Sequence, residues 1–298
     1  MGIKENKEKG MARKKKKRFW HYAYILPSFL GIIVFFLLPF CVVIYYSFIN
    51  NPVQKQFVGL DNFVLVLKNE AFLLALKNTV TFVFIAVPLA VIIPLILALL
   101  FEQGVFFKSQ LRSALLSPMM VPVASVVLVW RVLFDSHGVL NQVINIFGFT
   151  SVDWLKSDSG LWIMVVLFLW KNVGYNMIIF FAGLGSVPKE CIEVAKIEGA
   201  SKKTLFFKIT MRYLSPSLFF ATLISLINSF KIFREVYILT GDYPYEALYL
   251  LQHFMNNTFR SLDYQKMSTA AIIISFLMIV VIGLLFIIEH MLGRHMEE

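Results

Sequence analysis

Long apolar runs are the feature of this sequence that most limits how it can fold. A helix needs about 20 apolar residues to cross the roughly 30 Å of hydrocarbon in a bilayer. Runs of that kind recur along the 298 residues, of which 58% are hydrophobic. We therefore predict an all-α, polytopic membrane protein with about six spans, near residues 22–48, 78–101, 111–134, 161–181, 214–233 and 268–291.

Lysines and arginines indicate which loops face the cytoplasm, because basic loops are retained on that side. The net charge of +10 is concentrated in residues 1–18, at Lys108 and Arg112, in the stretch 188–216 and at Arg294. With an even number of spans all of these fall on one side. We therefore expect both termini to be cytoplasmic.

The predicted organisation is a basic cytoplasmic tail over 1–18, a transmembrane domain over 19–293 that includes a cytoplasmic loop at 186–213, and a short tail over 294–298. Membrane lipids with anionic headgroups account for the positive charge, and we expect no nucleic-acid partner.

Prolines interrupt the second and third predicted spans. Pro88 and Pro94 lie in the second span, and Pro118 and Pro122 lie in the third. Proline is tolerated in a membrane when neighbouring helices supply partners for the carbonyls that it frees. We expect these helices to be kinked and to lie inside a bundle.

The fourth predicted span carries polar residues near its centre. A charged side chain at the centre of a membrane helix costs about 2.5 to 3.5 kcal/mol on insertion. Lys171 and Asn172 lie near its middle, directly after Trp170. Helical spacing places Asn172, Tyr175 and Asn176 on one side. The amides, the phenol and the ammonium group can form directional hydrogen bonds to the hydroxyls of a sugar. The flat ring of the tryptophan can pack against the C–H face of the sugar. We predict a substrate-contacting face, with polar bonding between helices as the alternative.

A second polar stripe follows in the fifth predicted span. It consists of Thr222, Ser225, Asn228 and Ser229, with Lys231 closing it. We include Ser225, Asn228 and Ser229 in the predicted substrate pathway. Small hydroxyl residues in membrane helices more often serve helix packing, so that role stays open.

A polar, basic stretch from residue 188 to 216 separates these two spans. Ser186 and Pro188 are suited to begin a short helix, Gly199 is suited to end it, and Ser201 is suited to cap a second short helix. The first helix is too short to be stable alone and needs a partner groove. A solvated loop between two spans is the alternative.

The residue order in this stretch resembles the "EAA" cytoplasmic loop of permease subunits in bacterial binding-protein-dependent ABC importers. The matching positions are Glu193-Val194-Ala195, Glu198-Gly199-Ala200, Phe206, Ile209 and Pro216. Three positions depart from the pattern: Val194 replaces alanine, Glu198 replaces aspartate, and Arg212 stands where a first proline is common. The resemblance implies the bundle of a type I ABC importer permease, coupled to an ATPase subunit through Glu190, Glu193, Ala195, Glu198, Gly199 and Ala200.

Shorter segments resemble outer loops of the carbohydrate-importing branch of these permeases. They are Gly59 to Phe63, Asn78-Thr79, Gly138 with Asn141, and Leu239 to Pro244, which is similar to an "LTxGGP" turn that has lost its second glycine. The resemblance implies a bacterial cell-membrane importer with a second permease subunit, two ATPase subunits that hold ATP and Mg, an extracytoplasmic solute-binding protein and a carbohydrate substrate.

The sequence lacks the motifs for ATP hydrolysis, for metal binding and for catalysis in the membrane. No G-x-x-x-x-G-K-[ST] loop is present, so ATP hydrolysis is expected in another chain. The five histidines are scattered, and we expect no metal site and no cofactor. A membrane enzyme or an ion-coupled carrier would need paired acids in mid-span, and none is visible because Glu102 and Glu289 border spans. Permeases for glycerol phosphodiester, polyamine or phosphate, and a membrane enzyme, are the alternatives.

Overall fold

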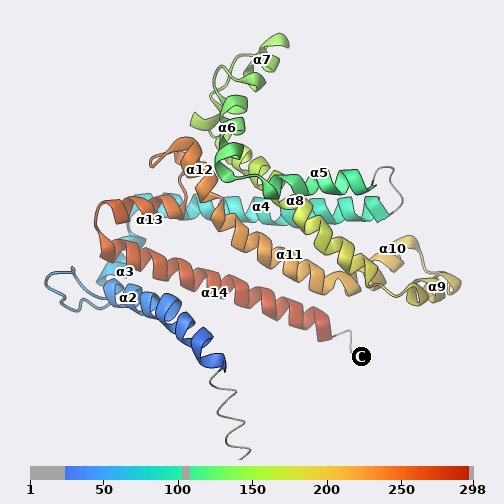
Figure 1. Cartoon of the computed structure of the whole chain (residues 1–298), viewed down its shortest axis with the longest axis horizontal. Helices are drawn as coiled ribbons and strands as arrows, with labels where there is room; N and C mark the ends of the chain where they lie inside the picture. The colour runs from blue at the N-terminus through green and yellow to red at the C-terminus, as the bar shows by residue number, and fades with distance from the viewer. Residues whose placement is uncertain (1–23, 103–107, 295–298) are drawn as a thin grey trace, which may run out of the picture. The chain divides into compact units, whose positions relative to one another are not determined.

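The computed structural model describes residues 24–102 and 108–294, which are almost entirely helical (Figure 1). Six helical segments in these residues are long and apolar enough to cross a membrane. They are Tyr24–Ser47, Glu70–Glu102, Val123–Ile146, Gly160–Gly185, Lys202–Thr240 and Tyr264–Met291. The predicted all-α architecture with about six spans is confirmed. The predicted tail at 1–18 and residues 295–298 lie outside the described residues.

The chain divides into two units, and the first holds residues 24–66 and 263–273 of the described chain. Its first helix includes a π-helical turn, η1 (Ile33–Leu37), and ends as α2 (Leu38–Ser47). A loop then leads to α3 (Asp61–Leu67). Asn62 Nδ2 donates hydrogen bonds to the carbonyls of Ser47 at 3.0 Å and Ile49 at 2.9 Å. These bonds hold the end of α2 against the start of α3.

The second unit covers residues 67–262 and 274–294. Its helices are α4 (Glu70–Glu102), α5 (Lys108–Met120), α6 (Val123–Phe134), α7 (Val139–Ile146), α8 (Gly160–Gly185), α9 (Lys189–Ile197), α10 (Lys202–Thr204), α11 (Met211–Lys231), α12 (Phe233–Thr240), α13 (Leu251–Arg260) and the later part of α14 (Tyr264–Arg294). The short 3-10 turns η2 (Trp154–Lys156) and η4 (Glu246–Leu248) connect them.

Helix α8 is the centre of the second unit and packs against α4, α5 and α11. Half of its 26 residues are buried, because these three helices cover them. Phe168 of α8 meets Phe82 of α4 edge to face, with ring centroids 5.5 Å apart. Met177 and Phe180 lie in a second cluster with Leu214 of α11. This packing holds the polar residues of α8 in place.

The predicted third span, residues 111–134, is interrupted in the structure. Helix α5 ends at Met120 and α6 begins at Val123. Pro122 lacks an N–H group and has an extended backbone with ψ of 140°, so the helix cannot continue through it. Figure 1 shows α6 leaving the direction of α5. By contrast, α4 is one helix through Pro88 and Pro94.

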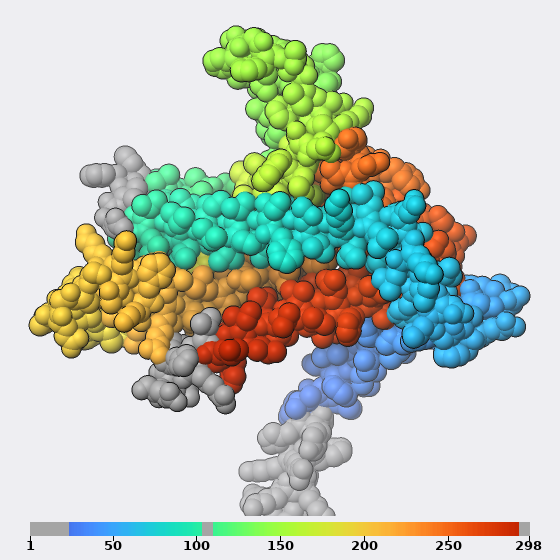
Figure 2. Space-filling model, turned by 180° about the vertical axis from the view of Figure 1, so that it is seen from behind, coloured from blue at the N-terminus to red at the C-terminus, as the bar shows by residue number. Residues whose placement is uncertain are grey.

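One side of α4 lies open at the surface over its whole length (Figure 2). Phe84 is 75% exposed on this helix, and Ile92, Ile96 and Leu100 are each 50% exposed. Apolar side chains that alternate with buried ones on a membrane helix are suited to lipid or to another membrane subunit.

Candidate functional site

Polar residues of α8, α11 and α12 meet around a cavity of about 160 Å³ within the second unit. Its lining consists of Met119, Phe168, Lys171, Asn172, Tyr175, Asn228, Lys231, Ile232 and Glu235. Four predicted pathway residues are therefore brought together here: Lys171, Asn172 and Tyr175 from the fourth span, and Asn228 from the fifth.

Side-chain amides form a short hydrogen-bonded chain in the cavity wall. Asn228 Nδ2 donates to Asn172 Oδ1 at 2.9 Å, and Lys231 Nζ donates to Asn228 Oδ1 at 3.3 Å. Asn172 Nδ2 donates to the Phe168 carbonyl at 2.8 Å. The Tyr175 hydroxyl has no hydrogen-bond partner among the described residues. The wall thus offers a free phenol beside amides that are held in place.

An ion pair between Lys171 and Glu235 closes one side of this cavity. The predicted site residues did not include Glu235. The fifth helical segment continues to Thr240, beyond the predicted end at 233, and carries Glu235 into the bundle. The signal was Lys171 itself, because a charge inside a membrane needs a counter-charge.

The other predicted pathway residues do not line this cavity. Asn176, Ser225 and Ser229 are buried, and their side chains bond to neighbouring helices or to their own backbone. Trp170 is 41% exposed, and its ring centroid lies 6.1 Å from that of Trp130. Asn176 and Ser225 take the packing role that the sequence left open.

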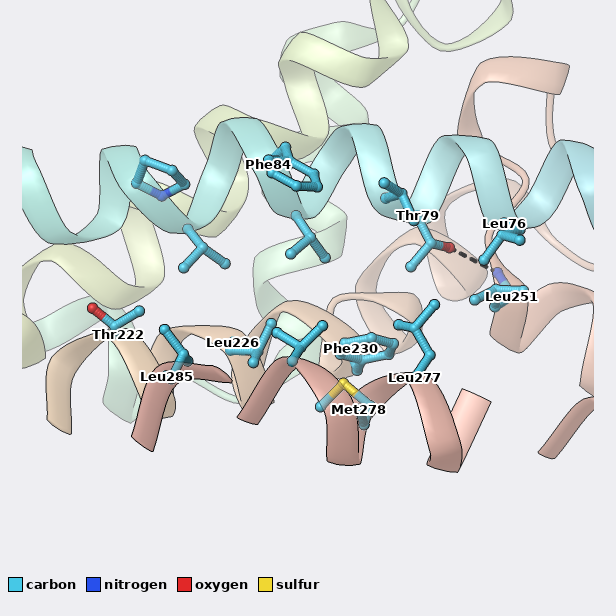
Figure 3. A pocket seen from close by; sticks show the side chains of 15 residues that line it. Leu76, Thr79, Phe84, Thr222, Leu226, Phe230, Leu251, Leu277, Met278 and Leu285 are labelled. Atoms are coloured by element: carbon cyan, nitrogen blue, oxygen red, sulfur yellow. Dashed lines mark hydrogen bonds between the residues drawn. The ribbon is translucent and has the colours of Figure 1, made fainter. Parts of the chain in front are cut away.

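A second cavity, of about 220 Å³, is apolar (Figure 3). It lies between α4, α11 and α14, and Leu76, Phe84, Phe230 and Met278 are among its lining side chains. The hydroxyl of Thr79 is occupied, because it accepts a hydrogen bond from the Leu251 N–H at 3.0 Å. Thr222, the other hydroxyl residue of the lining, donates to the Leu218 carbonyl at 2.7 Å, and the remaining lining side chains are apolar, so the cavity suits a hydroxylated solute poorly.

The cytoplasmic loop predicted at 186–213 contains α9, which ends as predicted at Gly199. Gly199 has a φ of +81°. Its N–H donates to the Lys196 carbonyl at 3.0 Å, and the Ala200 N–H donates to the Ala195 carbonyl at 2.9 Å. This pair of bonds is a Schellman motif, in which glycine takes the left-handed conformation that stops a helix.

The start of α9 differs from the prediction. Pro188 occupies the N-cap position, and no side chain caps the helix. Ser186 does not cap it, because its hydroxyl donates to the Gly183 carbonyl at 2.7 Å, at the end of α8. The serine thus belongs to the preceding helix.

The predicted second short helix is part of a much longer one. Ser201 caps it as expected, since its Oγ accepts from the Thr204 N–H at 3.2 Å. The chain is then helical through α10, a π-helical segment η3 (Leu205–Thr210) and α11. Arg212 lies inside this continuous helix, so the chain makes no turn at the position where related permeases commonly have a proline.

Helix α9 presents two different surfaces. One lines a cavity of about 560 Å³ formed by Glu190, Cys191, Val194, Ala195 and Glu198 together with Lys208, Ile209, Arg212 and Tyr213. Glu193 and Ile197 do not line it, and Ile197 is 86% exposed. Glu193 and Ile197 therefore lie on the side of α9 that is turned away from this cavity.

Six apolar helices in the described part of the chain, a polar cavity between them and the short exposed helix α9 are the features of a transport subunit embedded in a membrane. The sequence profile of the family described as binding-protein-dependent transport system inner membrane components matches residues 67–298, and the chain belongs to this family. It is a permease subunit of an ATP-driven importer, not an enzyme; in such systems the ATPase is a separate subunit, and a solute-binding protein takes part.

Relatives and solved structures match over most of the chain. The arabinooligosaccharides transport system permease protein AraP of Halalkalibacterium halodurans is 37% identical over 222 residues, which are 73% of this chain and 70% of the relative. The trehalose/maltose transport system permease protein MalF of Thermococcus litoralis is 30% identical over 263 residues, or 87% and 89%.

A crystal structure of a bacterial ABC transporter that imports the acidic polysaccharide alginate superimposes with a TM-score of 0.79 at 21% identity, covering 95% of this chain and 98% of that one. This likeness confirms the type I importer permease fold.

Proposed function

We propose that this chain forms half of the pathway by which an ATP-driven importer carries a carbohydrate, an oligosaccharide or a related polyol, into a bacterial cell. The cavity walled by Lys171, Asn172, Tyr175 and Asn228 carries the proposal. Amides, a phenol and an ammonium group are hydrogen-bonding partners for hydroxyls. The relatives named for arabinooligosaccharides and for trehalose and maltose support this substrate class.

A second permease subunit completes the site in this proposal. The cavity of about 160 Å³ is smaller than the roughly 300 Å³ at which pockets for small molecules begin. The open apolar side of α4 offers a membrane-embedded surface for that subunit or for lipid. A heterodimer of related permeases would enclose the solute between two such half-sites.

Helix α9 docks on an ATPase subunit in this scheme. Glu193 and Ile197 form the exposed contact, and Gly199 holds the turn behind them. ATP and Mg belong to two partner ATPase subunits, and this chain holds no cofactor. Closure of the ATP-bound ATPases favours the outward-facing pathway because that state has the higher affinity for the closed pair.

The compartments follow from α9. An ATPase is cytoplasmic, so α9 and both termini lie in the cytoplasm, and the turns that contain Gly138 and Gly241 face outward. A solute-binding protein delivers the carbohydrate to that outer side. The basic residues near α9 then lie where anionic lipids attract them.

A glycerol phosphate or related phosphodiester is the second candidate solute. The sn-glycerol-3-phosphate transport system permease protein UgpA of Escherichia coli is 28% identical over 274 residues, covering 89% of this chain and 92% of the relative. The cavity lining holds Lys231 as well as the Lys171–Glu235 pair, so a cationic polyamine is disfavoured.

Uptake by the native cell tests the proposal. A strain that lacks this chain is compared with the same strain complemented by it, using labelled arabino-oligosaccharides, malto-oligosaccharides and glycerol 3-phosphate. We expect complementation to restore uptake of a carbohydrate and an ATPase to co-purify with the chain. Restored uptake of glycerol phosphate alone supports the second candidate, and no change in any uptake contradicts both.

A further inference from the structure

Glu235 brings a buried carboxylate to the wall of the intramembrane cavity. The residue is 4% exposed and pairs with Lys171 of α8 through Oε1. Its second oxygen, Oε2, is buried and has no hydrogen-bond partner among the described residues. A buried ionised oxygen without a donor is costly, so a donor is expected at some stage of the working cycle.

We propose that the Lys171–Glu235 pair determines the specificity of the cavity and selects uncharged solutes, with Glu235 Oε2 accepting a hydrogen bond from a solute hydroxyl. The inference rests on the proposed carbohydrate pathway. A hydroxyl both donates and accepts, so it satisfies the carboxylate and the ammonium group together. Glu235 and Lys171 both line the cavity, and the terminal torsion of glutamate has broad preferences, so rotation of the carboxylate can bring an oxygen to the solute while Lys171 stays in reach of the other.

The charges around the cavity favour a neutral solute. The side chains of Lys171 and Glu235 are 21% and 5% exposed, so their charges lie in a medium of low polarity and cancel each other there. Lys231 is exposed, and water screens its charge. A solute carboxylate would meet a lysine that is already neutralised and a glutamate of its own sign. Repulsion of that kind gives specificity against the wrong solute.

The test is Glu235→Gln in the whole complex, reconstituted in liposomes with its ATPases and its solute-binding protein. Glutamine keeps the size and one acceptor oxygen but leaves Lys171 with an unbalanced positive charge. Uptake is measured for a neutral oligosaccharide and for one of equal length that carries a uronate. We expect the ratio of uronate uptake to neutral uptake to rise about tenfold in the variant, because the unbalanced charge of Lys171 attracts the uronate. The wild type and the variant use the same binding protein, so a change in this ratio comes from the permease.

The matched control is Glu246→Gln, which makes the same chemical change at an exposed acid outside the cavity. Its ratio should equal that of the wild type. An equal fall of both uptakes in Glu235→Gln, with an unchanged ratio, would show that the pair only packs helices and would overturn the inference.

A second variant removes both charges in case the single change prevents assembly. Lys171→Met combined with Glu235→Gln leaves no unpaired charge, and such replacements of buried pairs are often neutral for folding. We expect this complex to assemble and its half-saturating concentration of neutral oligosaccharide to rise about tenfold. Unchanged saturation overturns the inference alone, whereas a wild-type complex that imports no carbohydrate removes the proposed function as well.

Discussion

Asn176 of α8 supplies the hydrogen-bond donor that the carbonyl of Ala90 in α4 lacks, at 2.6 Å. Pro94 has no N–H group, so the carbonyl four residues before it loses its partner within the helix. The same amide nitrogen donates to Ser225 Oγ of α11 at 2.7 Å. The Asn176 side chain therefore satisfies the carbonyl that Pro94 leaves without a donor, and it links α8 to α4 and α11.

Replacing Asn176 with alanine should destabilise the bundle. The change leaves the Ala90 carbonyl buried without a donor, and such groups cost about 1–3 kcal/mol. We expect a lower midpoint of thermal unfolding for the purified complex. The control is Asn145→Ala, at an exposed amide that bonds only to the exposed Ser151 hydroxyl, which should lower the midpoint much less. Equal midpoints in the two variants would contradict the assigned role of Asn176.

Gly174 sets the distance between α8 and α5. A Cβ atom at this position would lie 1.9 Å from the Leu115 carbonyl oxygen, so Gly174→Ala must push the helices apart. We expect a loss of about 1–3 kcal/mol of stability, typical of overpacking. Gly185→Ala meets nothing within 4 Å and should be neutral or slightly stabilising. Chemical denaturation of both variants checks the difference, and a neutral Gly174→Ala would contradict the close contact.

Acid should weaken the part of the second unit around His253 of α13, a helix that lies outside the candidate membrane spans. Burial lowers the pKa of His253 from 6.5 to about 4, although Asp242 acts in the opposite direction. The neutral ring accepts the Leu250 N–H at 3.1 Å through Nδ1. Below pH 6.5 the unfolded chain binds a proton that the folded chain does not, so stability falls as the pH falls.

The loss should be about 1.4 kcal/mol per pH unit, and about 3 kcal/mol in total by pH 4. Unfolding midpoints measured between pH 7.5 and pH 4 check this, with His253→Asn as the reference because asparagine retains an acceptor but does not titrate. If the two proteins lose stability in parallel over this range, His253 is not the titrating group.

The exposed side of α9 should govern association with the ATPase. Glu193→Ala with Ile197→Ala removes an exposed charge and an exposed apolar group, and neither residue lines the cavity between α9 and η3. We expect at least tenfold less ATPase to co-purify, with unchanged unfolding of the permease. Glu190 was also predicted to take part in coupling, but it lies on the face turned towards η3, so Glu190→Ala serves as the comparison and should retain the ATPase. Equal retention of ATPase by both variants would contradict this division of the helix.

Much of the fold was predictable because it depends on local rules. Apolar length identifies the spans, Gly199 stops α9, and Ser201 caps α10. The expectation that neighbouring helices satisfy proline sites is confirmed at Pro94, where Asn176 does so.

The candidate site was only partly predictable. Asn172 and Asn176 share a helical face by their spacing, yet Asn172 lines the cavity and Asn176 bonds to α4 and α11. Helical periodicity predicts which residues share one face of a helix, but it does not predict which other helix or cavity that face contacts. The partner of Lys171 lies 64 residues away, on a helix that follows the predicted end of the fifth span, so no local pattern reveals it.

Tyr175→Phe is the most direct test of the central claim that the cavity carries the solute. The change removes one oxygen, which has no partner among the described residues, and should leave folding and ATPase association intact. Loss of one solute hydrogen bond, worth about 1 kcal/mol, should raise the half-saturating carbohydrate concentration of the reconstituted importer about fivefold. Tyr45→Phe, at an exposed tyrosine of α2, is the control. Equal saturation of both variants and the wild type would contradict the claim.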